Sequence, residues 1–190
     1  MESAEKCVME VQAGEVQKYV HIVEAFQAPL YRYCTRMLGN RQEAEDAVQD
    51  ILIKAFEKIE GYEPTGSFSS WLYRIAHYHC LNLLRKRSVQ RKFQRWFRQD
   101  TIAESAEQTI TGRLFGEPLA SAISSLNAEE RSLLILRVLE EKSFAEIGEI
   151  AGMSAGAVKK KYGRLKLKLQ KLMEQKGGVG YAQSQSYTSR

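Results

Sequence analysis

The stretch GSFSSWLYRIAHYHCLNLLRKR, residues 66–87, decides the fold of this chain, because its apolar residues recur every three or four positions. That period is typical of a helix with one buried face. The inward positions are Phe68, Leu72, Ile75, Cys80 and then Leu83 or Leu84. The other face carries Arg74, Tyr78, Asn82 and Arg85, with Trp71 one turn earlier. The sequence therefore predicts a helix with a core face and a face that is cationic and aromatic.

Two histidines and a cysteine within this helix raise the question of a metal site. In a helix, His77 and His79 project about 200° apart, so they cannot both bind one ion. His77 and Cys80 could do so, but the sequence offers no CxxC or HxxxH pair to complete the ligand set. We therefore predict that no metal binds here and that Cys80 is an ordinary core residue.

The cationic and aromatic face suits unpaired nucleic acid. Aromatic rings stack on bases, at about 1–3 kcal/mol per base, while arginine holds phosphate and asparagine reads base edges. Trp71 has an alternative place, in the core, and the sequence leaves both open.

The helical period continues toward the N-terminus, where two further helices are expected over residues 16–38 and 41–59. Pro29 should kink or split the first of them. Gly39 should end it, and Asn40 with Glu43 forms a capping-box start for the second. The second helix carries an acidic and polar stripe made of Glu43, Asp46, Gln49 and Asp50. Such a stripe is usually a solvated face; on a basic protein it favours a protein partner over DNA.

The C-terminal third predicts a helix-turn-helix. Asn127 with Glu130, and Ser143 with Glu146, are capping boxes that start two helices. Gly152 supplies a tight turn, and Ser154 caps the next helix, as this motif requires. The cations expected to point outward from that helix are Lys159, Lys160 and Arg164. The alternative is a helical hairpin whose lysines are simply solvated.

Charge favours a polyanionic partner: the net charge is +5 and the isoelectric point is about 9.1. Two runs, residues 85–98 and 159–171, hold seven cations each and no acid. Two such runs are typical of a protein that contacts one long polyanion at two places. Three widely spaced cysteines do not make a disulfide framework and indicate a reducing compartment. No apolar run approaches the roughly 20 residues of a membrane span, so we expect a cytoplasmic protein.

No catalytic constellation is recognisable: P-loop, GxSxG and HExxH are all absent from the sequence. We expect a protein that is not an enzyme, has no catalytic residues, and takes no cofactor and no small-molecule substrate.

Two long segments resemble one family. Residues 30–87 look like region 2 of bacterial RNA polymerase sigma factors of the extracytoplasmic-function (ECF) group, within the sigma-70 family, and residues 126–172 resemble their region 4. The resemblance implies an all-α fold of two small domains joined by a flexible linker. The expected bounds are residues 1–90 for region 2, 91–118 for the linker, 119–176 for region 4 and 177–190 for a disordered tail.

The resemblance also implies a role for each part. Asp46, Gln49 and Asp50 would dock on the β′ clamp of core RNA polymerase, and region 4 would meet the β flap. The −10 promoter element, as single strand and adjacent duplex, would contact Trp71, Arg74, Tyr78, Asn82, Arg85, Lys86 and Arg87. The −35 element, as duplex, would contact Ser154, Lys159, Lys160 and Arg164. An anti-sigma factor, commonly membrane-anchored, would regulate the protein.

Two departures from the family pattern bear on specificity. Where the family usually has Asn and, four residues later, Asp, this sequence has Tyr78 and Asn82. Its recognition helix reads Ala-Val-Lys-Lys-Lys over residues 157–161 in place of the frequent Thr-Val-Lys-Ser-Arg. A stand-alone helix-turn-helix regulator that binds duplex DNA without polymerase is the alternative function.

Overall fold

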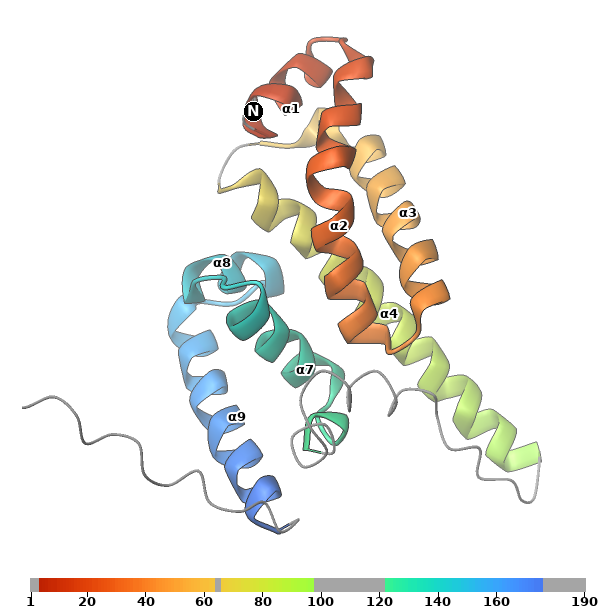
Figure 1. Cartoon of the computed structure of the whole chain (residues 1–190), viewed down its shortest axis with the longest axis vertical. Coiled ribbons are helices and arrows are strands. Elements are labelled where there is room, and N and C mark those ends of the chain that lie inside the picture. The colour runs from red at the N-terminus through yellow and green to blue at the C-terminus, as the bar shows by residue number, and fades with distance from the viewer. Residues whose placement is uncertain (1–3, 64–65, 98–121, 176–190) are drawn as a thin grey trace, which may run out of the picture.

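The computed structural model describes residues 4–63, 66–97 and 122–175 (Figure 1). Within these ranges every regular element is a helix, which confirms the predicted all-α fold. The N-terminal part contains α1 (Ala4–Gln12), α2 (Tyr19–Leu38), α3 (Arg41–Lys58) and α4 (Phe68–Phe97), with 3₁₀ turns η1 at Val16–Lys18 and η2 at Ile59–Gly61. The C-terminal part contains α7 (Ala128–Leu134), the π-helical η3 (Ile135–Leu139), α8 (Phe144–Ala151) and α9 (Ala155–Gln175).

The turn between α2 and α3 follows the sequence prediction. Gly39 has a φ of +68°, a left-handed conformation that glycine adopts at little cost, and its N–H bonds to the Thr35 carbonyl. Asn40 then caps α3 by accepting a hydrogen bond from the Glu43 N–H at 3.0 Å, but the Glu43 side chain pairs with Arg87, so only half of the predicted capping box is formed. Of the two expected effects of Pro29, a split is excluded because α2 runs through Pro29 as one helix, and a kink stays a prediction. The sequence prediction also missed α1.

The core of the N-terminal part lies between α2, α3 and α4. The predicted apolar stripe of α3 is buried throughout: Ala44, Val48, Ile51, Ala55 and Ile59. From α2 it meets Leu30, Tyr33 and Met37, each with no exposed surface. Phe68, Leu72 and Cys80 of α4 close the core, as the helical period predicted.

Helix α4 is longer than the sequence pattern suggested. It reaches Phe97, beyond residue 91 where the linker was expected to begin, although the domain bounds themselves stay a prediction. In Figure 1, α4 passes beneath α2 and α3, while α7, α8 and α9 gather beside it. The same helix therefore contributes to the N-terminal core and contacts the C-terminal part, so it places both parts relative to each other.

The C-terminal part is a small helical unit with its own apolar contacts. Ile147 and Ile150 of α8 are buried, as are Val158 and Leu165 of α9. Both predicted capping boxes are present, at Asn127 and at Ser143. These contacts fix the angle between α8 and α9, which together form the predicted helix-turn-helix.

Candidate nucleic-acid interface

The exposed strip of α4 has the composition that the sequence predicted. The side chains of Arg74, Tyr78, Asn82 and Arg85 are all exposed, while Leu72, Ala76 and Cys80 behind them are buried. Tyr78 is 42% exposed, a large fraction for an aromatic residue on a packed helix. A cation, an aromatic ring and an amide thus share one surface of α4. We call these four residues the α4 strip.

Trp71 takes the place that the core alternative described. Its ring lies 5.1 Å from that of Tyr62 and 5.4 Å from that of Phe68, measured between centroids. Half-buried in this aromatic cluster, Trp71 borders the segment between η2 and α4. Tyr78 is more exposed than Trp71, so it is the more accessible of these two rings on the surface of α4.

The cations at the end of the predicted −10 site are not equivalent. Arg85 and Lys86 are exposed. Arg87 donates a hydrogen bond to the Leu38 carbonyl at 2.9 Å and forms an ion pair with Glu43. It therefore covers the C-terminal carbonyls of α2, where a cation is favourable. In this structure Arg87 ties α4 to the α2–α3 turn.

The acidic stripe on α3 is accessible, since Asp46, Gln49 and Asp50 are all exposed. Lys54, one turn beyond Asp50, donates to Nδ1 of His79 on α4 at 2.7 Å. Burial and the Lys54 charge both lower the pKa of His79, so its 3.8 Å approach to Asp50 is not an ion pair at neutral pH. Asp50 thus keeps its charge available to a partner.

The turn between α8 and α9 depends on two glycines. Gly152 ends α8 with a φ of +68°. Gly148 has no room for a side chain, because a Cβ there would lie 2.6 Å from the Met153 carbonyl oxygen. Ser154 caps α9 by accepting a hydrogen bond from the Ala157 N–H at 3.2 Å. Ser154, predicted to contact DNA, therefore has a structural role as well.

The cations of α9 fall into two groups. Lys159 and Lys160 are exposed, as a DNA-facing pair should be. Lys161 and Lys168 instead pair with α7, at 3.1 Å to Glu129 and 2.6 Å to Glu130. Although burial opposes it, the hydrogen bonds from Lys168 and from the Asn127 N–H lower the pKa of Glu130.

Arg164, the remaining predicted −35 contact, also borders a cavity. It lines a cavity of about 600 Å³ between α4 and the C-terminal part, together with His77, Tyr78 and Leu81. Arg164 is also exposed and lies one helical turn after Lys160, so it borders both the cavity and the outward side of α9.

A buried polar chain joins the two parts of the protein, and sequence reasoning did not anticipate it. The Ser132 hydroxyl on α7 lies 2.8 Å from the Tyr33 hydroxyl and 2.8 Å from Nδ1 of His77. Tyr33 and Ser132 have no exposed surface, and His77 has 5%. Burial lowers the pKa of His77 to about 4, so the ring is neutral and shares a hydrogen bond between Nδ1 and the Ser132 hydroxyl. Each buried group thus depends on a partner across the contact.

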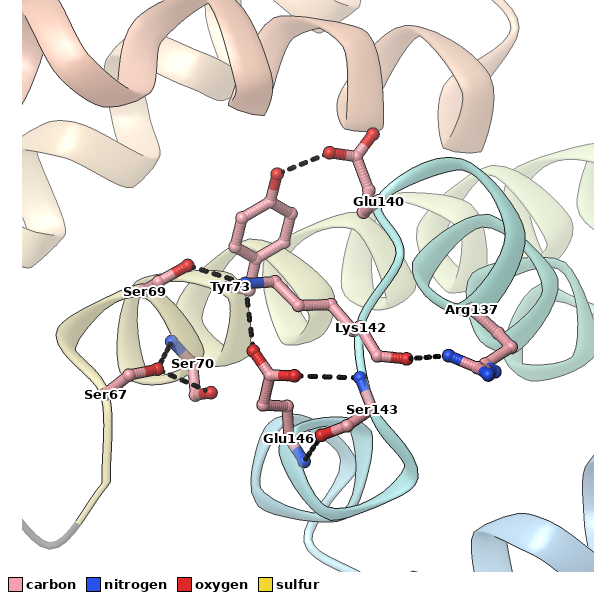
Figure 2. A network of polar contacts seen from close by, with 9 residues as sticks. All are labelled: Ser67, Ser69, Ser70, Tyr73, Arg137, Glu140, Lys142, Ser143 and Glu146. Atoms are coloured by element: carbon pink, nitrogen blue, oxygen red, sulfur yellow. Dashed lines mark hydrogen bonds and ion pairs between the residues drawn. The ribbon is translucent and has the colours of Figure 1, made fainter.

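A second set of polar contacts surrounds Glu140, at the end of η3 (Figure 2). Its carboxylate accepts a hydrogen bond from the Tyr73 hydroxyl at 2.8 Å and pairs with Arg36 at 2.9 Å. Burial, and then the Glu140 hydrogen bond, raise the pKa of Tyr73. Lys142 donates to the Ser69 hydroxyl at 2.9 Å and also reaches Glu146 (Figure 2). Here α2 and α4 are held against the segment that leads into α8.

The four residues of the run HYHC, residues 77–80, each have a different environment. His77 belongs to the buried chain, Tyr78 is exposed, His79 bonds to Lys54, and Cys80 packs in the core. The Cys80 thiol lies 3.8 Å from that of Cys34, a proximity with no sequence signal. Within the described residues, no group of three potential ligands is placed to hold a metal ion. A helix long and apolar enough to cross a bilayer is likewise missing from that part of the chain.

Comparison with known proteins matches two family models and several relatives to this chain. The Sigma-70 region 2 model matches residues 22–90, and the Sigma-70, region 4 model matches residues 116–169. The ECF RNA polymerase sigma factor SigW of Bacillus subtilis (strain 168) is 28% identical over 164 residues, covering 81% of this chain and 88% of SigW. The RNA polymerase sigma factor YlaC of the same strain is 30% identical over 148 residues, covering 76% and 85%.

The fold is also found in a solved structure, that of the sigma factor RpoE from Bartonella quintana in complex with the anti-sigma factor NepR. It has a TM-score of 0.64 and 23% identity, covering 83% of this chain and 98% of RpoE. Fold and interface define an all-helical protein of two small domains, the second with a helix-turn-helix. The chain belongs to the sigma-70 family, in its ECF group, and is a sigma factor. Members of this family are transcription initiation factors and not enzymes.

Proposed function

We propose that this sigma factor docks core RNA polymerase through α3 and reads promoter DNA through α4 and α9. The observation that carries the proposal is the α4 strip, in which Arg74, Tyr78 and Asn82 are exposed on the domain that matches region 2. The ring of Tyr78 would stack on an unpaired base of the −10 element. Arg85 and Lys86 would hold the adjacent duplex backbone, where phosphate contacts fix position without reading sequence.

The −35 element would meet the exposed side of α9. Lys159 and Lys160 would bind phosphates there, and Ser154 stands at the N-terminus of the same helix. A recognition helix that presents lysines derives affinity from the backbone more than from base edges. We therefore expect −35 recognition that is tolerant of sequence.

The polymerase contact would be the exposed face of α3. Asp46, Gln49 and Asp50 form an acidic patch on a protein of net charge +5, so a basic polymerase surface fits them better than DNA does. An anti-sigma factor, cytoplasmic or membrane-anchored, is the regulator that we propose, since RpoE of similar fold binds NepR. The protein would work in the cytoplasm, where polymerase is found, without being an enzyme itself.

The deciding experiment replaces the two carboxylates together. Asp46→Ala with Asp50→Ala should weaken binding to core polymerase about tenfold or more, since about 1.4 kcal/mol corresponds to a factor of ten. Fluorescence titration against core enzyme measures the affinity, and run-off transcription from candidate promoters measures the activity. Glu45→Ala is the matched control, because Glu45 is an exposed acid on a neighbouring face of α3.

Equal affinity of the double variant and the wild type would rule out docking through this face. A protein that binds duplex DNA tightly but supports no polymerase-dependent transcript would contradict the sigma-factor mechanism altogether.

A further inference from the structure

Lys54 of α3 bonds to the neighbouring helix and not to the acid one turn before it. Asp50 and Lys54 are four residues apart on α3, with the acid on the N-terminal side, which is the favoured arrangement for an ion pair along a helix. The Lys54 ammonium nevertheless reaches α4, where it donates to Nδ1 of His79 at 2.7 Å. The imidazole therefore holds a cation that would otherwise fit Asp50.

The contact with Lys54 fixes which nitrogen of His79 carries the proton. An ammonium group can only donate, so Nδ1 accepts and the neutral ring carries its proton on Nε2. Burial, followed by the charge of Lys54, lowers the pKa of His79; Lys86 of α4 adds to this shift and Asp50 opposes it. The ring is therefore neutral at neutral pH, and it acts as the acceptor for Lys54.

The other nitrogen of His79 lies near Asp50. Nε2 is buried and has no hydrogen-bond partner among the described residues, and Oδ2 of Asp50 is 3.8 Å from it. This distance is longer than a hydrogen bond of about 3 Å, so the N–H does not occupy the carboxylate. The Asp50 side chain is 61% exposed, whereas that of His79 is 10% exposed. The ring thus stands as a neutral spacer between a cation and a carboxylate that faces solvent.

Without the imidazole, Lys54 would find its partner on α3. Asp50 lies one turn before it, and Glu57, three residues after it, is on the less favoured C-terminal side. Asp50 is one of the carboxylates that we propose to meet a basic polymerase surface. An ammonium group bound to Asp50 would cancel the charge that attracts this surface. His79 therefore prevents an internal ion pair that would compete with docking.

We propose that His79 is a positioning residue for polymerase docking: it holds Lys54 against α4 and so keeps the Asp50 carboxylate available to the partner. The inference rests on the proposed docking function of α3, and it adds a residue of a different helix, α4, that acts through Lys54. The contact between Lys54 and His79 can be measured without polymerase.

A double-mutant cycle between His79 and Lys54 tests the proposal. His79→Ala should weaken binding to core RNA polymerase about two- to threefold at low salt, the effect that one exposed helical ion pair can exert. Adding Lys54→Met to this variant should restore the wild-type affinity, because no ammonium group remains to pair with Asp50. Lys54→Met alone should bind at least as tightly as the wild type. Fluorescence titration against core enzyme measures all four proteins.

Two further variants separate this role from general effects. Lys58→Met removes an exposed cation one turn after Lys54, and it should not rescue His79→Ala. A rescue by Lys58→Met would mean that only net charge matters, which would contradict the proposal. His79→Asn keeps an acceptor close to the position of Nδ1, so it should hold Lys54 and bind as the wild type does. If the imidazole only fills space between α3 and α4, Lys54→Met cannot restore the loss.

The pH dependence of docking is a readout that a space-filling role would not change. A protonated His79 donates from both nitrogens, so it releases Lys54 and pairs with Asp50 directly. Because the pKa of His79 is lowered, this happens below its ordinary value of 6.5. The affinity of the wild type relative to His79→Asn should therefore fall below pH 6.5. Identical pH profiles for the two proteins would overturn the proposal.

Failure of the inference and failure of the proposed function give different results. If Asp46→Ala with Asp50→Ala binds core polymerase as tightly as the wild type, docking through α3 is ruled out and the inference falls with it. If that double variant is weakened while His79→Ala binds normally, the inference alone is refuted. Nitrogen NMR of the imidazoles, without polymerase, should show the proton on Nε2 of His79. A proton on Nδ1 would exclude the contact with Lys54 and overturn the proposal.

Discussion

Single residues decide whether the helix-turn-helix can form, and Gly148 is the clearest case. A Cβ at Gly148 would lie 2.6 Å from the Met153 carbonyl oxygen, which is backbone and cannot move aside cheaply. Gly163, in the middle of α9, has no atom within 4 Å of its would-be Cβ. Gly148 is therefore required by its close contact, whereas Gly163 could be replaced by a residue with a side chain without a clash.

Alanine at each position should change stability in opposite directions. Gly148→Ala should destabilise the C-terminal part by about 1–3 kcal/mol through overpacking. Gly163→Ala should stabilise it by up to about 1 kcal/mol, the difference in helix propensity between glycine and alanine. Urea denaturation followed by circular dichroism gives both values. A neutral Gly148→Ala would mean that the turn is looser than described.

Protonation of His77 should open the contact between the two parts. Burial lowers the pKa of His77 from 6.5 to about 4, with Glu129 opposing this shift and Lys161 adding to it. Because the folded pKa is depressed, the contact is fully stable above pH 6.5 and weakens as the pH falls toward 4. The radius of gyration should therefore rise over that window.

The control for this prediction is His77→Gln, which keeps a polar group but cannot titrate. In this variant the radius of gyration should not rise between pH 6.5 and 4 because of residue 77, whereas any change caused by carboxylates should remain. Proton NMR of the imidazoles gives the pKa directly, and with only three histidines in the chain the signals are few. A His77 pKa near 6.5 would show that the ring is solvated.

At the scale of elements, the sequence determines helices better than it determines their ends. The apolar stripe of α3 and the caps at Gly39, Asn127 and Ser143 were readable, because each depends on residues close in sequence. Helix α1 escaped notice, and α4 proved longer than its apolar pattern. Helix α1 packs its buried residues Cys7, Val8 and Val11 against the rest of the N-terminal part, a tertiary contact that local propensity does not contain.

Pro29 is a helix-breaking residue that the packed N-terminal part accommodates inside α2. It lies inside α2, where its ring removes one backbone hydrogen bond and crowds the preceding turn. Pro29→Ala should therefore stabilise the N-terminal part, by at most about 3 kcal/mol. Differential scanning calorimetry checks this through a higher melting temperature. Ala28→Gly, at the neighbouring position of the same helix, should lower the melting temperature, which shows that helix propensity is expressed there.

At the scale of the whole molecule, charge is divided between separate surfaces. The predicted DNA contacts Lys159 and Lys160 are exposed on α9, while Asp46 and Asp50 are exposed on α3. The exposure of these residues followed from helical period alone. What the sequence could not contain is the Tyr33–Ser132–His77 chain, whose members are 99 and 55 residues apart. Nothing local marks them as partners. Of the two rings against Trp71, Phe68 lies three residues earlier in the same helix, whereas Tyr62 lies before α4 and has no helical spacing to it.

The salt dependence of duplex DNA binding should show how many phosphates the α9 cations neutralise. If Lys159 and Lys160 each neutralise one phosphate, the double alanine variant should reduce the slope of log K against log salt by about 2 × 0.9. Titration of a duplex at several salt concentrations measures it. Lys58→Ala, an exposed cation on α3, should leave the slope unchanged. If the slope fell equally in the double variant and in Lys58→Ala, DNA would be attracted diffusely to the whole protein and not to α9.

The burial of every cysteine has a practical consequence for studying these motions. Cys7, Cys34 and Cys80 are at most 2% exposed, so maleimides and disulfide reagents reach them only when the N-terminal core opens. A cysteine introduced on the surface can then carry a dye or spin label while the native three stay unmodified. The rate at which the native thiols react then measures how often the N-terminal core opens. The introduced label can measure separation of the two domains in the same sample.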